Sequence, residues 1–203
     1  MINMAKEIKL RRYDFAKLFN RLGYSYFTKG SYNLNIIGIR SKGDKVTNLF
    51  DDYLVLIYKN NNGKWTRKIY QITTDPGIVF MKNPSNPKGT AILVPGQYRA
   101  AWMIAKHRGK YNALCQRKNV DVYRDNNKND IYDFKPETID NGVFGINIHK
   151  AGNASKRVDN WSAGCQVFAN DSEFTTFMEF CKKQKDLYGN TFTYTLLNEE
   201  DLV

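Results

Sequence analysis

Much of the chain consists of short segments rich in β-branched and aromatic residues, separated by turn-forming residues, and this pattern limits the folds open to it. Residues 32–40, 52–58 and 65–73 have this composition and predict strands. Residues 60–63 are Asn-Asn-Asn-Gly, and because Asn and Gly tolerate positive φ, they predict a hairpin turn between the last two strands. We therefore expect a mainly β protein.

The strand pattern continues downstream with one ambiguous stretch. Residues 90–98 predict a strand, a turn and a second strand, and residues 120–123 alternate as a strand. Residues 191–197 alternate as a closing strand. Residues 99–117 fit either a helix or two strands broken at Gly109, and the pattern alone leaves both open.

Two segments predict helices, one near each end of the chain. Residues 4–22 place apolar side chains roughly on one side and Lys and Arg on the other, and Gly23 is a credible stop. We favour a helix docked on the core over one that binds a surface. A capping cluster at residues 170–172 precedes apolar residues at helical spacing through Lys185.

Together these segments predict a mainly β fold with flanking helices, of the α+β class. We divide the chain into a basic amphipathic helical segment, residues 1–30, and a main domain, residues 31–203, that carries the C-terminal helix and strand. An aromatic content of 14% and a hydrophobic content of 42% argue against disorder. No internal repeat or interdomain linker is visible.

The composition narrows the partners and the covalent chemistry. Thirty-one Lys and Arg against twenty Asp and Glu give a net charge of +11, which favours nucleic acid, anionic lipid or acidic wall polymers as partners without choosing among them. The three cysteines, Cys115, Cys165 and Cys181, are odd in number and widely spaced, so they support neither a disulfide framework nor a four-ligand zinc site.

The polar segment 124–133 is the one place where a cation deserves consideration. Asp125, Asn127 and Asp130 supply the hard oxygens that Ca²⁺ prefers. The spacing of an EF-hand loop, with its Gly and final Glu, is missing, so we favour a solvated turn. No metal or cofactor is implied by the sequence.

The segment 145–168 carries the clearest chemistry. Residues 146–148 alternate like a half-buried strand that would end at His149, and a turn of small residues, 162–165, leads from Ser162 to Cys165. A thiol beside a glycine has backbone N–H groups directed at whatever it attacks, and a nearby imidazole can remove its proton. These are the minimal groups for acyl transfer.

Two alternatives stand beside this pair. A cysteine in a small-residue turn can be a small buried hydrophobic residue. His107 with Cys115 is a second His/Cys pair, but neither residue adjoins a tight turn, so we favour His149 with Cys165.

The segment resembles the signature of the L,D-transpeptidase catalytic domain, in which a His at a strand end is followed by a Ser/Thr-x-Gly-Cys turn. Here Ile148-His149 precedes Ser162-Ala163-Gly164-Cys165. Residues 70–75 and 94–98 are similar to the strand and the Thr-Pro-x-Gly-x-Tyr/Phe element upstream in that family, so the resemblance covers roughly residues 50–170 in order. It implies an L,D-transpeptidase-like β-sandwich or barrel.

The resemblance implies a role for each matching residue. Cys165 would be the nucleophile, His149 its base, and the backbone carbonyl of Lys150 the group that orients the imidazole. Gly164 and Cys165 would supply the two oxyanion-binding N–H groups, and Ser162 would steady the turn. We also expect the imidazole and the backbone donors to lower the thiol pKa, which would make Cys165 the most reactive thiol.

Two positions depart from the family pattern. Ala163 replaces a His or another polar residue, and Val167 replaces an Arg or Asn that shapes the substrate site. Gln166 or Arg157 are candidate substitutes. Because transfer needs a second stem peptide held in place, we expect these losses to favour hydrolysis over transpeptidation.

The resulting expectation is an enzyme that cleaves or exchanges a peptide bond in peptidoglycan stems through an acyl-enzyme on Cys165. The first alternative is a non-catalytic virion or structural module that binds wall polymer, with nucleic acid the less favoured partner. A papain-like amidase is disfavoured, because there the Cys precedes the His. No signal peptide or membrane span is visible, so we expect phage-type release or another special delivery to the wall, and otherwise a cytoplasmic location.

Overall fold

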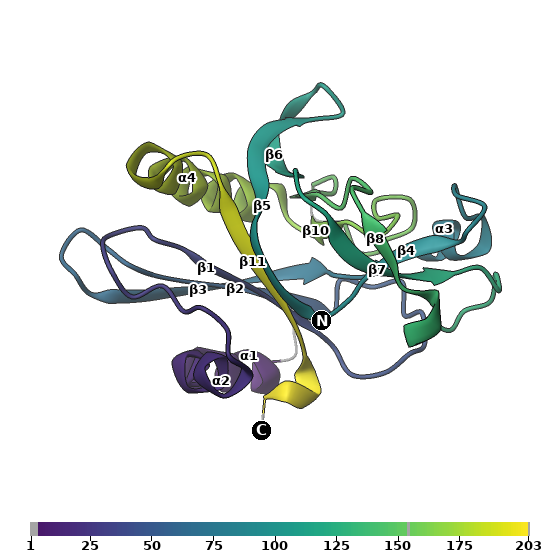
Figure 1. Cartoon of the computed structure of the whole chain (residues 1–203), viewed down its shortest axis with the longest axis horizontal. Coiled ribbons are helices and arrows are strands. Elements are labelled where there is room, and N and C mark those ends of the chain that lie inside the picture. Colours follow the sequence, from purple (N-terminus) through teal and green to yellow (C-terminus); the bar gives the residue numbers. More distant parts are fainter. Residues whose placement is uncertain (1–3, 154, 203) are drawn as a thin grey trace.

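A computed structural model describes residues 4–153 and 155–202, and these residues form an eight-stranded closed barrel with a small second sheet (Figure 1). The barrel order is β1-β11-β5-β6-β9-β10-β3-β2. The barrel strands are β1 (Asn35–Arg40), β2 (Asp52–Lys59), β3 (Trp65–Thr73), β5 (Gly96–His107), β6 (Tyr111–Gln116), β9 (Ile148–Lys150), β10 (Gln166–Phe168) and β11 (Phe192–Asn198). The mainly β prediction with flanking helices is confirmed.

Local hairpins and two parallel contacts close the barrel. Strands β2 and β3 pair antiparallel across the predicted 60–63 turn, where Gly63 has a φ of 70°. The ambiguous stretch 99–117 is a second hairpin, β5 and β6, turned at residues 108–110. Parallel contacts join β1 to β11 and β9 to β10. Antiparallel pairs between strands distant in sequence, β5 with β11, β6 with β9 and β3 with β10, complete the wall, so the barrel depends on long-range pairing as much as on local hairpins.

The interior holds one large core to which the C-terminal helix contributes. Helix α4 (Asp171–Tyr188) begins at Asn170, whose side chain accepts hydrogen bonds from Ser172 and Glu173 N–H, as predicted for the cluster. Its apolar face packs with inward-facing strand residues that include Ile148 and Phe168. Helix residues in this core are Phe174, Phe177, Met178 and Cys181.

The N-terminal segment is two helices, not one. Helix α1 (Met4–Arg12) ends before Asp14, which caps α2 (Phe15–Leu22) by accepting from Lys17 N–H at 3.1 Å. The expected single helix over 4–22 was wrong because Asp14 starts a new helix. The predicted stop is confirmed, since Gly23 adopts φ 69° and closes α2.

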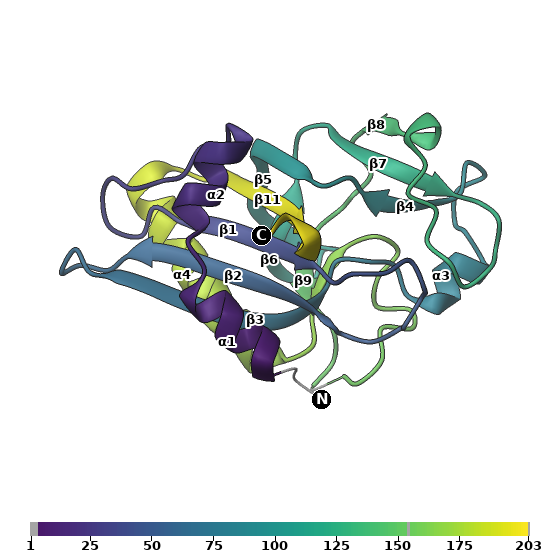
Figure 2. The same cartoon turned by 90° about the horizontal axis from the view of Figure 1, so that it is seen from below.

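The two helices lie across the outer face of β1, β2 and β3 (Figure 2). Their buried side chains share a second apolar cluster with outward-facing strand residues. The cluster contains Leu10, Phe15, Leu18 and Phe19 from the helices and Ile37, Ile39, Tyr53, Val55 and Ile57 from the strands. Docking on the core, the favoured interpretation of this segment, is confirmed.

A smaller sheet of β4 (Thr90–Leu93), β7 (Val120–Asp125) and β8 (Asp140–Gly142) stands beside the barrel, with the short helix α3 (Ile78–Lys82) near it (Figure 1). The polar segment 124–133 leaves this sheet. The Asp125 carboxylate accepts from Asn127 and Asp133 N–H, which folds the segment on itself. Short 3₁₀ turns, η1 (Pro136–Thr138) and η2 (Glu199–Asp201), complete the described elements.

A buried charged network joins the strand ends near the small sheet. Arg40 Nε lies 2.8 Å from Asp75 Oδ1, and its Nη2 donates to the Leu93 carbonyl at 3.0 Å. Asp52 accepts from Thr74 N–H at 2.7 Å. Burial raises the pKa of Asp75, and Arg40 opposes that rise. Because each charge has a charged or backbone partner, the network fixes these ends in place.

Candidate active site

Strands β5, β6, β9 and β10 bring Cys165 and both histidines to one face of the barrel wall. His149 and Val167 are register partners on the parallel strands β9 and β10, so their side chains leave the sheet on the same side. Cys165 precedes Val167 by two positions and shares that side. Ile148 and Phe168 point the other way, into the main core. Cys165 and His149 therefore lie on adjacent segments with matching orientation.

The turn before Cys165 is built by Ser162 and Gly164. Ser162 is fully buried, and its Oγ accepts from Gly164 N–H at 3.1 Å and donates to the Cys165 carbonyl at 2.8 Å. Gly164 has a φ of 118°, and a Cβ there would lie 2.2 Å from the Ala91 carbonyl oxygen, so only glycine fits. Ser162 thus holds the turn as expected.

One part of the expected oxyanion site is wrong for the resting protein. The N–H of Gly164 is already donated to Ser162 Oγ, so it does not face the space in front of Cys165. Within the described ranges, the backbone N–H of Cys165 has no hydrogen-bond partner. The Cys165 N–H is therefore the member of the predicted pair that remains free to bind an oxyanion.

The half-buried thiol of Cys165 is held by backbone groups. Its Sγ accepts from Asn147 N–H at 3.4 Å and donates to the Gly145 carbonyl at 3.4 Å, and no hydrogen bond joins it to His149 in the described structure. Burial raises the thiol pKa to about 11, while Asn147 N–H and Arg108 act in the opposite direction. The expectation of a lowered thiol pKa is thus wrong: the resting thiol keeps its proton.

His149 is a neutral base with one defined tautomer. It is the middle residue of β9, whereas the sequence predicted a strand that ends at His149, and its Nδ1 lies 2.9 Å from the Lys150 carbonyl oxygen. Because a carbonyl only accepts, Nδ1 carries the proton and Nε2 is bare. Burial, followed by His107 and Arg108, lowers the pKa of His149 to about 3. The imidazole is therefore unprotonated at neutral pH, and its Nε2 lone pair is free.

Lys150 orients His149 through its carbonyl, as expected, and is itself tethered. Its Nζ forms a 2.6 Å ion pair with Asp171 at the start of α4. The Tyr111 hydroxyl also donates to the Lys150 carbonyl, at 3.4 Å. These contacts fix the peptide that sets the ring plane of His149.

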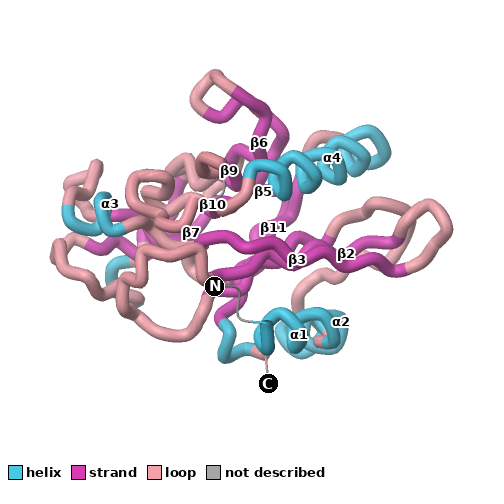
Figure 3. The backbone as a smooth tube through the Cα atoms, turned by 180° about the vertical axis from the view of Figure 1, so that it is seen from behind, coloured by secondary structure: helices cyan, strands magenta, loops and turns pink. Residues whose placement is uncertain are grey.

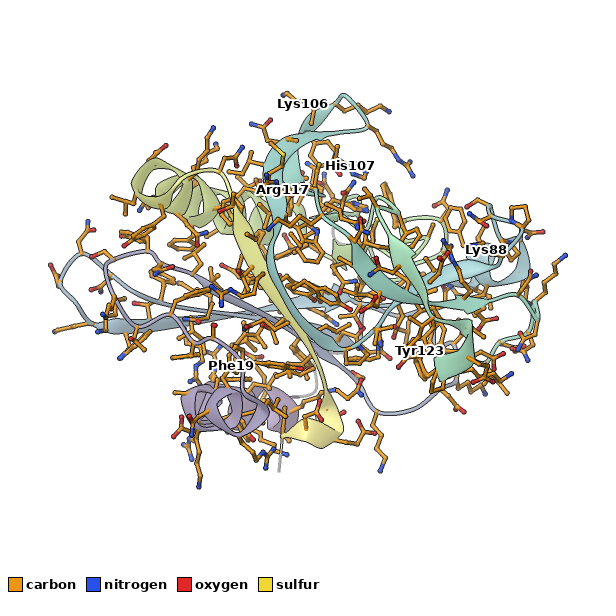
Figure 4. All side chains as sticks on the ribbon, in the orientation of Figure 1. Phe19, Lys88, Lys106, His107, Arg117 and Tyr123 are labelled. Atoms are coloured by element: carbon orange, nitrogen blue, oxygen red, sulfur yellow. The ribbon has the colours of Figure 1, made fainter. Side chains whose placement is uncertain are left out.

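His107 belongs to the same cluster, which sequence reasoning missed. Its ring stacks on His149, with centroids 4.2 Å apart and 20° between the planes. Strand β6 lies between β5 and β9, and its register places the small Ala113 beside His149, which leaves room for His107 to reach across. Figure 4 shows His107 and Lys106 on the hairpin that projects from the barrel. The two candidate His/Cys pairs are thus parts of one cluster.

Arg108 gives this face a positive charge. It follows His107 in the hairpin turn with φ 49°. Arg108 lowers the pKa of four neighbouring groups, though burial is the largest influence on each: His107, His149, Tyr111 and Cys165. Arg108 therefore places a cation near the thiol and both imidazoles, on a part of the chain other than Gln166 and Arg157, the substitutes considered for the Arg or Asn that Val167 replaces.

The substitutes considered from the sequence do not reach the thiol. Gln166 is fully buried and accepts from Tyr194 OH at 2.8 Å, so it is a core residue. Arg157 pairs with Asp159 at 3.5 Å on the surface. Val167 is buried with Phe50 and other apolar side chains. The local signal that could have pointed to the hairpin is the motif His107 to Tyr111, which places one of only two histidines beside an arginine and a turn glycine.

No protein-family model, curated protein or solved structure matches the chain significantly. Within residues 4–153 and 155–202, no group of three or more His, Cys, Asp or Glu side chains is placed to hold a metal ion. Over the same residues, no helix has both the length and the apolar character needed to cross a membrane.

Proposed function

We propose that this protein is an L,D-transpeptidase-like cysteine acyltransferase or peptidase that acts on peptidoglycan stem peptides. The observation that carries the proposal is the shared face of Cys165 and His149 on neighbouring segments, with the bare Nε2 of His149 fixed by the Lys150 carbonyl. The order His then Cys and the Ser-x-Gly-Cys turn match the family signature. The barrel with a helix packed into its core is compatible with the fold of that family.

The chemistry follows from the protonation states. On substrate binding, the Cys165 S–H turns from the Gly145 carbonyl toward His149, and the imidazole takes the proton as sulfur attacks the peptide carbonyl carbon. The C–S bond forms and the carbonyl becomes an oxyanion, which the Cys165 N–H stabilises. The His149 proton then passes to the leaving amine as the C–N bond breaks. Water or another amine releases the acyl group and regenerates the thiol.

Cys165 and His149 are both uncharged before substrate binds, so proton transfer between them accompanies attack on the substrate. A thiol pKa of about 11 and an imidazole pKa of about 3 leave both groups uncharged at neutral pH. The ion pair that forms during attack is therefore costly, and the charge of Arg108, which lowers the thiol pKa, offsets part of the cost on the sulfur. Arg108 is the residue of the hairpin that we assign to this electrostatic role.

The +11 charge suits attraction to an acidic wall. The alternative is a non-catalytic module of the same fold that binds wall polymer or nucleic acid. The paired placement of Cys165 and His149 favours the enzyme, because a binding module has no need for a bare imidazole beside a thiol.

Incubation with purified tetrapeptide muropeptides and excess D-amino acid tests the proposal, with products identified by mass spectrometry. We expect a covalent adduct on Cys165 and shortened stem peptides. Shortened products should exceed exchanged or cross-linked ones, since water needs no second binding site. Mostly exchanged material would overturn the preference for hydrolysis, and unchanged muropeptides with no adduct would overturn the enzyme.

A further inference from the structure

His107 contacts His149 directly and is linked to Cys165 through Asn147. Its ring stacks on His149 at 4.2 Å. Its Nδ1 lies 3.1 Å from the Nδ2 of Asn147, whose backbone N–H donates to Cys165 Sγ at 3.4 Å. His107 is 7% exposed, so these contacts are made by a side chain with little freedom to move.

The orientation of Asn147 fixes the proton on His107. The Asn147 Oδ1 accepts from Gln116 N–H at 2.9 Å, so its amide nitrogen must face His107. An amide nitrogen only donates, and the Nδ1 of His107 is therefore an acceptor, with the ring proton on Nε2. His149 has the opposite tautomer, because its Nδ1 donates to the Lys150 carbonyl. The stack thus pairs two neutral rings with opposite tautomers.

We propose that His107 is a positioning residue for this site: its ring holds the plane of His149, and its Nδ1 anchors Asn147, the residue that donates to the Cys165 sulfur. The inference rests on the proposed function only in taking Cys165 and His149 as the reacting pair. It adds a residue from the β5–β6 hairpin that the signature does not contain.

Protonation of His107 would undo both contacts. A protonated Nδ1 cannot accept from Asn147, and the new positive charge would lie against His149. The other groups that face His107 are Arg108 in the turn and Tyr111, whose ring centroid is 5.6 Å away on β6. Burial and Arg108 both lower the pKa of His107, and both therefore favour the neutral ring that these contacts need.

Two matched variants separate the two contacts. His107→Phe keeps a flat ring for stacking and removes the acceptor. His107→Asn keeps an acceptor close to the place of Nδ1 and removes the ring. The chain has only two histidines, so each variant leaves His149 as the single imidazole in a nitrogen-15 NMR spectrum. Thermal melting of both variants checks that they fold.

In the wild type we expect two imidazoles of opposite tautomer, with the ring that has a protonated Nδ1 remaining neutral down to about pH 5. In His107→Phe the pKa of His149 should rise, since one influence that lowers it is gone. Both variants should lower kcat on muropeptides by between about ten- and a hundredfold with little change in KM, because misplaced reacting groups slow the chemical step.

Two results would overturn the inference. One is a wild-type spectrum in which both imidazoles carry the proton on Nδ1, a measurement that needs no variant to fold. The other is an unchanged His149 tautomer and titration in both folded variants. If these spectra change as expected but wild-type protein leaves muropeptides intact, the positioning role stands and the proposed function fails.

Discussion

The barrel presents two outer faces of opposite character. Over β1, β2 and β3, helices α1 and α2 pack their own apolar side chains, among them Phe19 of α2, against outward-facing strand residues. Over β5, β6, β9 and β10, the outward positions carry His107, His149 and Cys165, whereas helix α4 packs against the inward-facing residues of the main core. The β5–β6 hairpin projects beyond the barrel (Figure 3). Strands buried on both faces can only contribute packing. Reactive groups need a face that no helix covers.

The largest expected effect is the loss of activity when Cys165 or His149, on the outer face that no helix covers, is replaced. Cys165→Ala and His149→Ala should each lower muropeptide turnover by at least about a thousandfold, since paired catalytic groups act as a unit. Melting temperature should stay close to that of wild type. Cys115→Ala is the matched control, because Cys115 is also a half-buried thiol, and it should remain active. Full activity of Cys165→Ala would remove the basis for the site.

The second effect tests protonation on the uncovered face. With a thiol pKa of about 11, roughly one Cys165 in ten thousand is ionised at pH 7, so its alkylation by iodoacetamide should rise about tenfold per pH unit up to pH 10. Peptide mapping follows each cysteine separately. Cys181, fully buried in the core, should react only on unfolding. A half-maximal rate for Cys165 below about pH 9 would contradict the raised pKa.

The third effect belongs to the covered face. Phe19→Ala should lower the free energy of unfolding by about 3–5 kcal/mol, because it leaves a cavity between α2 and the barrel. Activity per folded molecule should not change. Ile8→Ala is the control, since Ile8 is 47% exposed and should cost little. Urea denaturation measures the free energy of unfolding of both variants. Equal losses in the two would contradict the role of Phe19 in the apolar cluster between the helices and the barrel.

The smallest effect concerns Arg108. Removing its charge in Arg108→Ala should raise the Cys165 pKa further and lower kcat/KM at pH 7, since a cation that favours the thiolate is gone. Arg108→Lys keeps the charge and should retain most activity. Steady-state kinetics at low and at roughly 0.5 M salt should show a smaller difference between the variants at high salt. Equal activity of both variants would exclude the electrostatic role.

Strands that are marked by local sequence signals were predictable. Strands that depend on pairing with distant parts of the barrel were less so. Residues 52–58 and 65–73 were predicted within one residue of β2 and β3, because an apolar run and a turn signal identify them locally. The break at Asp14 was missed because apolar periodicity continues across it, although aspartate is a common cap. Stretch 99–117 stayed ambiguous, since its strand character depends on neighbours distant in sequence.

For the candidate site, the sequence indicated which residues to consider, and only the folded structure showed their neighbours and their burial. The roles of Ser162 and the Lys150 carbonyl were expected from the resemblance of this segment to a family signature. The link between His107 and His149 could not be predicted, because it arises only where β5 and β9 flank β6. The direction of the thiol pKa was wrong for a related reason: burial is a property of the folded chain and outweighs the nearby donors.

The hydrogen bond from the Cys165 thiol to the Gly145 carbonyl also bears on how the protein ages. Peroxide and disulfide reagents attack thiolates, and a sulfur that keeps its proton at neutral pH offers them little to attack. We therefore expect Cys165 to oxidise slowly in air at neutral pH, because protonation rather than an added reductant protects its sulfur.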